Sequence, residues 1–64
     1  MPYKINKDLP SAVKNVLPSA AQTIFRKAFN NAHEHYRSEV RAFKVAWAAV
    51  KRQYEKREGK WTKI

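Results

Sequence analysis

Two histidines flank a glutamate in the stretch His33, Glu34 and His35, the part of the sequence closest to a metal-binding motif. On a helix, side chains two residues apart face nearly opposite ways, so a shared ion needs a spacing of four. The residue four after His33 is Arg37, whose positive charge would repel a cation. We therefore predict two solvated histidines at a helix end, with no metal site and no cofactor.

Serines and carboxylates offer no catalytic arrangement. Ser11, Ser19 and Ser38 stand at or near expected helix starts, where capping accounts for their hydroxyl groups. No histidine or carboxylate has the spacing of a nucleophilic triad, and no two carboxylates are paired for acid–base work. A single glycine also rules out a glycine-rich phosphate loop. We predict a protein that is not an enzyme and has no small-molecule substrate.

Positive charge is the strongest chemical signal in the chain. Fourteen lysines and arginines against five acidic residues give a formal net charge of +9. Residues 37–64 carry nine basic and three acidic side chains, compared with five and two in residues 1–36. This imbalance indicates an acidic partner, which could be nucleic acid, an anionic membrane surface or an acidic protein.

Four basic residues share one arc of the last expected helix with no acidic residue among them, the pattern expected for phosphate contacts. Such contacts position a protein on nucleic acid but read no bases, and the arc has no cluster of Asn or Gln. We therefore predict largely sequence-independent binding. An ordinary solvated surface is the alternative. The candidate nucleic-acid-binding residues, including two lysines near the C-terminus, are Arg41, Lys44, Lys51, Arg52, Lys60 and Lys63.

Helix signals begin early in the chain. Asp8 is a plausible N-cap for a short helix that Pro18 ends. Ser19 followed three residues later by Gln22 is a capping-box pattern, which predicts a longer helix over about residues 20–36.

A second long helix is expected over about residues 39–57. Ser38 can cap its start, and Gly59 is suited to the position just beyond its end. Because little more than Arg37 separates the two long helices, we expect either a tight corner or an antiparallel hairpin.

Apolar residues recur at spacings of three and four along both long helices, so each helix has one face that can be buried. The alternative for the aromatic residues of the last helix is a platform on which bases stack, and packing in the core is the preferred interpretation. Trp61 has two interpretations as well: packing over the helices beside Tyr3, or exposure as a stacking residue between Lys60 and Lys63. The predicted core is Phe25, Phe29, Tyr36, Phe43, Trp47, Val50, Tyr54 and Trp61.

The two ends of the chain are candidates for short strands, at residues 3–5 and 60–64. The predicted fold is therefore mostly α: a small bundle of about three helices with a minimal two-stranded sheet joining the N- and C-termini, in a single domain over residues 1–64. There are no cysteines, no apolar run of the ~20 residues that span a membrane, and no secretory signal. We expect a cytoplasmic protein that does not span the membrane.

Four motifs, MPYK at residues 1–4, DLP at 8–10, VLP at 16–18 and KVAWAAVK at 44–51, resemble the ChaB family of small bacterial and viral proteins. Matching positions cover nearly the whole chain, and Tyr54, Lys60 and Trp61 are among them. The resemblance implies a compact helical fold with a small sheet joining the two ends, and no catalytic residues. It also implies regulation of cation transport beside a sodium/calcium–proton antiporter, or, from viral relatives, DNA binding. A long charge-rich segment found between the last two helices of enteric members is nearly absent here.

Two functions follow as hypotheses. The first and favoured one is nucleic-acid binding through the basic last helix. The alternative is a regulator that contacts an acidic protein or the cytoplasmic face of a cation/proton antiporter.

Overall fold

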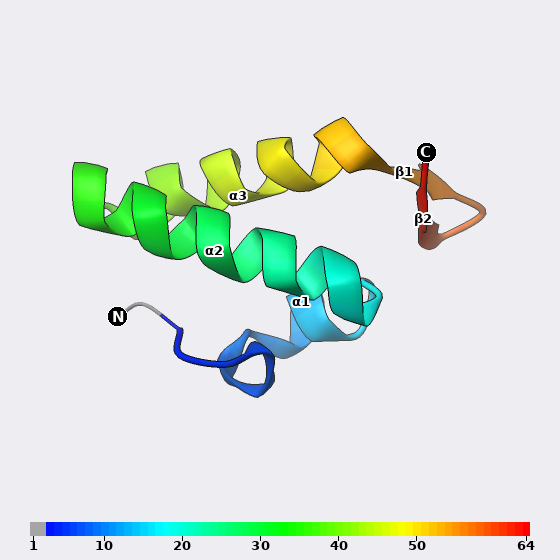
Figure 1. Ribbon diagram of the computed structural model, residues 1–64, viewed down its shortest axis with the longest axis horizontal. Coiled ribbons are helices and arrows are strands. Elements are labelled where there is room, and N and C mark those ends of the chain that lie inside the picture. The colour runs from blue at the N-terminus through cyan, green and yellow to red at the C-terminus, as the bar shows by residue number, and fades with distance from the viewer. Residues whose placement is uncertain (1–2) are drawn as a thin grey trace.

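Two antiparallel helices form the body of the structure, a computed structural model that describes residues 3–64. In Figure 1 they lie side by side, and the segment before them, with η1 and α1, passes below α2 in that view. Within the described residues, the mostly α fold with three α-helices and a two-stranded sheet is confirmed. The elements are η1 (Asn6–Asp8), α1 (Ser11–Lys14), α2 (Ser19–Tyr36), α3 (Glu39–Gln53), β1 (Tyr54–Arg57) and β2 (Lys60–Lys63).

The turn between α2 and α3 contains only Arg37 and Ser38, and of the two expected arrangements the chain forms the antiparallel hairpin of helices. Arg37 adopts a left-handed backbone conformation with φ 55°, and its N–H donates a 2.8 Å hydrogen bond to the carbonyl of His33. This bond caps the last turn of α2. At the start of α3 the Ser38 hydroxyl accepts a 3.4 Å hydrogen bond from the Arg41 N–H, so the predicted N-cap is confirmed.

The predicted caps of the two earlier helices are wrong. Pro18 is the N-cap of α2, and its carbonyl accepts the 2.9 Å hydrogen bond from the Gln22 N–H. The Gln22 side chain forms no capping box, because its amide donates instead to the carbonyls of Leu17 at 2.9 Å and Lys14 at 3.3 Å. Asp8 ends η1, and α1 begins three residues later after Pro10. In both places a proline already holds the extended backbone that an N-cap needs.

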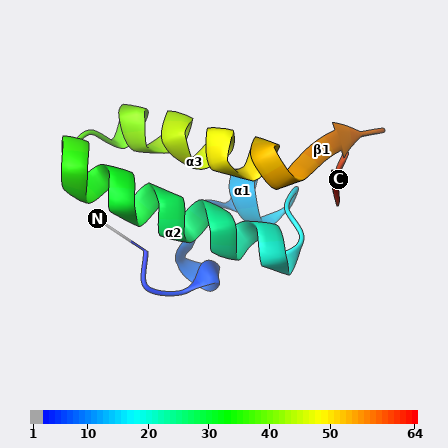
Figure 2. The ribbon, with the colours of Figure 1, turned by 45° about the horizontal axis from the view of Figure 1, so that its top comes forward.

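The last helix ends at Gln53, four residues before the predicted end, because Tyr54 starts a strand. The two strands pair antiparallel, with Tyr54 opposite Lys63 and Arg57 opposite Lys60. Gly59 therefore lies in the hairpin turn and not beyond a helix end. The φ values of Glu58 and Gly59 are 50° and 80°, the positive pair that a tight type I′ turn requires. Figure 2 shows the hairpin continuing from the end of α3, away from both helices.

The sheet does not join the two ends of the chain, so that part of the prediction is wrong. Within the described residues the only sheet pairs β1 with β2. Tyr3 instead contacts α2, where its N–H donates to Asn30 Oδ1 at 2.8 Å and its carbonyl accepts from Asn30 Nδ2 at 2.7 Å. The Tyr3 ring packs on Phe29 with ring centroids 4.9 Å apart, while Ile5 is 53% exposed. Burial of Tyr3, and to a lesser extent the charge of Glu39, raises the pKa of its phenol.

The predicted core residues fall into three groups by their burial. Phe25, Phe29, Val50 and Tyr54 are buried, as predicted, whereas Tyr36 is 49% exposed and does not belong to the core. Tyr36 is the last residue of α2 and stands directly before the turn into α3. The remaining predicted members pack partly buried against the core, namely Phe43, Trp47 and Trp61. The core also takes in the apolar residues of the N-terminal segment, namely Leu9, Val13 and Leu17.

Asn30 is expected to fasten the N-terminal segment to α2. Asn30→Ala removes both hydrogen bonds to Tyr3, so the partly buried N–H and carbonyl of Tyr3 lose their protein partners. We therefore expect the free energy of unfolding to fall by about 1–3 kcal/mol. Asn31→Ala is the matched control, since Asn31 is the exposed next residue of the same helix. Urea denaturation of both variants measures the difference. Equal stability would mean that the two hydrogen bonds contribute nothing net.

Phe25 and Tyr36 are aromatic residues of the same helix, but Phe25 is buried and Tyr36 is exposed. Phe25→Ala should cost about 3–5 kcal/mol, because a fully buried ring leaves a cavity. Tyr36→Ala should change stability by only about 0.5 kcal/mol, as for most surface positions. Thermal melting followed by circular dichroism distinguishes them, and a Tyr36 variant as unstable as the Phe25 variant would contradict the assigned core.

Candidate interaction surface

Four exposed cations lie along one side of α3, and we call them the basic arc: Arg41, Lys44, Lys51 and Arg52. The fully buried residues of the same helix are Ala42, Ala46 and Val50, which occupy the opposite side by helical geometry. From first to last, the basic arc spans about 16 Å along the helix axis. Because α3 is held by its buried face, the arc presents four cations on a rigid support.

An aromatic residue that the sequence assigned to the core lies at the start of the basic arc. The guanidinium carbon of Arg41 is 5.7 Å from the centroid of the Tyr36 ring, within the range of a cation–π contact. Tyr36 also meets His35 edge to face, with ring centroids 5.3 Å apart. The feature of the sequence that indicates the exposure of Tyr36 is its position directly before the turn at Arg37.

The two candidate lysines of β2 do not share one surface. Side chains alternate along a strand, and the register puts Lys63 opposite Tyr54 but Lys60 opposite Arg57. Lys63 therefore lies on the face of the hairpin that carries Tyr54 and Trp61, whereas Lys60 lies on the other face. The six predicted binding residues thus divide between the basic arc and two faces of the hairpin.

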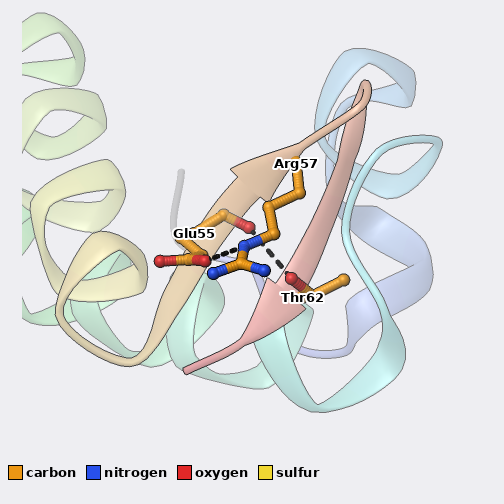
Figure 3. Close-up of polar contacts among 3 residues, drawn as sticks. All are labelled: Glu55, Arg57 and Thr62. Carbon is orange, nitrogen blue, oxygen red and sulfur yellow. Dashed lines mark hydrogen bonds and ion pairs between the residues drawn. The ribbon is translucent and has the colours of Figure 1, made fainter.

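The face of the hairpin that carries Lys60 is partly neutralised. Figure 3 shows Arg57 paired with the Glu55 carboxylate and Thr62 reaching across from β2. The Thr62 hydroxyl donates to the Glu55 carbonyl at 3.4 Å. With Glu55 occupied by Arg57, this face offers an acidic partner less net charge than the basic arc does.

A shallow pocket lies where α1, α3 and the hairpin meet. Trp61 lies over Trp47 with ring centroids 5.5 Å apart and planes inclined by 32°, so Trp61 packs against α3 and not beside Tyr3. Trp47 also contacts Phe25 edge to face at 5.1 Å. The pocket has a volume of about 400 Å³, and we call it the tryptophan pocket; its lining residues are Ala12, Val16, Trp47, Lys51, Lys56 and Trp61.

The two histidines face different surroundings. His33 stacks on Phe29 with ring centroids 5.8 Å apart, while His35 contacts Tyr36. Nowhere in residues 3–64 do three or more His, Cys, Asp or Glu side chains gather in a way that could hold a metal ion. The same part of the chain buries no polar or charged residue. None of its helices is both long and apolar enough to cross a membrane.

Comparison with known proteins gives the family. Residues 9–63 match the family model described as ChaB. The chain belongs to the ChaB family. It is 49% identical over 74 aligned residues to the "Putative cation transport regulator ChaB" of Escherichia coli (strain K12), covering 98% of this chain and 97% of the relative. The protein of the same name from Shigella flexneri matches with the same identity and coverage.

A solved ChaB structure has the same fold. The solution NMR structure titled as the putative cation transport regulator ChaB superposes with a TM-score of 0.88 at 47% sequence identity, over 98% of this chain and 99% of that one. The predicted membership of the ChaB family is thereby confirmed. In this ChaB protein the matched residues 9–63 include the whole basic arc and all six residues that line the tryptophan pocket.

Proposed function

We propose that this chain is a non-enzymatic regulator of cation transport that acts by binding an acidic surface of a partner protein, with the cytoplasmic face of a cation/proton antiporter as its target. The observation that carries the proposal is 49% identity, over nearly the full length of both chains, to proteins named "Putative cation transport regulator ChaB". This reverses the order of the two hypotheses drawn from the sequence, where nucleic-acid binding came first.

The charge distribution supports contact with an acidic partner. All four members of the basic arc are exposed, and they lie on a helix whose other side is buried. Complementary charge across an interface speeds association and selects the partner more than it strengthens affinity. A rigid row of cations suits a regulator that must find one acidic surface among many.

Transport by an antiporter in inverted bacterial membrane vesicles tests this function. We expect the purified protein to change the rate of cation-driven proton exchange, measured by recovery of a quenched pH-sensitive dye. The triple variant Arg41→Gln, Lys44→Gln and Arg52→Gln should melt like the wild type, because these side chains are exposed, and should lose most of the effect.

The matched control for that experiment removes the same charge elsewhere. Lys4, Lys7 and Lys27 are exposed and lie outside α3, so their triple Gln variant should regulate like the wild type. Equal loss in both variants would assign the effect to total charge. A wild-type protein without any effect on transport would contradict the proposed function.

Nucleic-acid binding remains a second candidate, because the basic arc also has the makeup of a phosphate-binding surface. Its four cations lie along about 16 Å of helix, a length over which duplex DNA presents several phosphates. Charge alone reads no bases, so this binding would be largely independent of sequence.

A titration against duplex DNA at several salt concentrations tests this second candidate. Log affinity falls with log salt by about 0.9 per neutralised phosphate. If the arc binds phosphates, alanine at Arg41, Lys44, Lys51 and Arg52 should weaken binding and make the slope shallower by up to ~3–4. Several unrelated duplexes should weaken alike. A wild-type protein without DNA affinity at low salt would rule the candidate out.

A further inference from the structure

The tryptophan pocket combines an apolar floor with a cationic rim. Val16 is 38% exposed although it is apolar, and it lines the pocket together with the two partly buried indoles. None of the six lining residues is acidic. The volume of about 400 Å³ is within the range of small ligand sites and is ample for one large apolar side chain.

The two lysines of the rim are placed beside the two indoles by local geometry. Lys51 follows Trp47 by one helical turn, so both side chains lie on the same side of α3. Lys56 is the cross-strand partner of Trp61, so both lie on the same face of the hairpin. Both lysines line the pocket, one on each element that carries a tryptophan.

The indoles are arranged as walls of a pocket more than as a stacking platform. A platform for bases needs free ring faces, but Trp47 is contacted by both Trp61, at 5.5 Å, and Phe25, at 5.1 Å. What these rings leave open is a recess completed by the aliphatic groups of Ala12 and Val16. Such a recess favours an inserted aliphatic or aromatic side chain over a stacked base.

We infer that the tryptophan pocket binds an acidic peptide segment of the partner protein, by taking in one large apolar side chain whose neighbouring carboxylates meet Lys51 and Lys56. Charge complementarity selects this occupant, because an apolar segment without carboxylates would leave the cationic rim unpaired. The inference rests on the proposed function in one respect, because it requires that the chain binds a partner protein. The apolar contact would supply affinity, while the two lysines select segments that carry acidic residues.

Binding of a model peptide tests the inference without any transport assay. The probe is acetyl-Glu-Glu-Phe-Glu-Glu-amide, and the two controls replace Phe by Ser or all four Glu by Gln. Two-dimensional ¹H–¹⁵N NMR follows the side-chain N–H signals of Trp47 and Trp61, which Trp61→Phe assigns. We expect the probe to shift both signals saturably, and each control peptide to bind at least several-fold more weakly.

Two double variants then distinguish the contribution of the two rim lysines from that of the total charge. Lys51→Gln with Lys56→Gln should weaken binding of the probe by about three- to tenfold, as expected for two exposed ion pairs. Lys4→Gln with Lys27→Gln removes the same charge from exposed positions that do not line the pocket, and it should bind like the wild type.

Three outcomes would overturn the inference. The first is no shift of either indole signal by the probe, and the second is equal weakening in both charge variants. The third is stronger binding of an octamer of deoxythymidine than of the probe at the same two indoles, which would make the pocket a base-binding site. A protein that still changes antiporter activity after any of these results would retain the proposed function and lose only this pocket as its contact.

Discussion

Packing between α2 and α3 is the interaction on which the rest of the structure depends. Phe25 is its centre: the ring is fully buried and contacts Phe29, Phe43 and Trp47, with ring centroids between 5.1 and 6.3 Å apart. Fully buried alanines on both helices, Ala21, Ala42 and Ala46, leave room for these rings. The chain has no cysteine to form a disulfide, so its 64 residues must obtain their stability from such contacts.

The helix α3 links this core to every candidate binding feature. Its buried side holds Ala42, Ala46 and Val50, and its exposed side carries the basic arc. At its end the chain passes directly into β1, whose hairpin places Trp61 over Trp47. The arc and the tryptophan pocket share Lys51, so one partner could contact both without any change in the fold.

The distribution of charge explains how so short and strongly basic a chain can stay folded. A net charge of +9 opposes a compact state through self-repulsion. In the described part of the chain no charged residue is buried, and the basic side chains of α3 lie in solvent, where water and salt screen them. The positive charges therefore stay out of the buried core, and an acidic partner would relieve part of their mutual repulsion.

The sequence by itself determined the two long helices, the cap at Ser38, the buried places of Phe25, Phe29 and Val50, and the family. The helices, the cap and the buried places depend on spacings of three and four residues and on neighbours along the chain, which a helix imposes locally. The family follows instead from the resemblance of the four motifs. Only the tertiary structure decided that α3 stops at Gln53, that Asn30 holds Tyr3, and that Trp61 packs on Trp47. Strands of three or four residues carry too little periodicity to name their partner, so pairing depends on contacts between distant segments. Tyr36 shows the same limit on a helix, because its spacing fits the apolar stripe but its side chain, at the last position of α2, is 49% exposed.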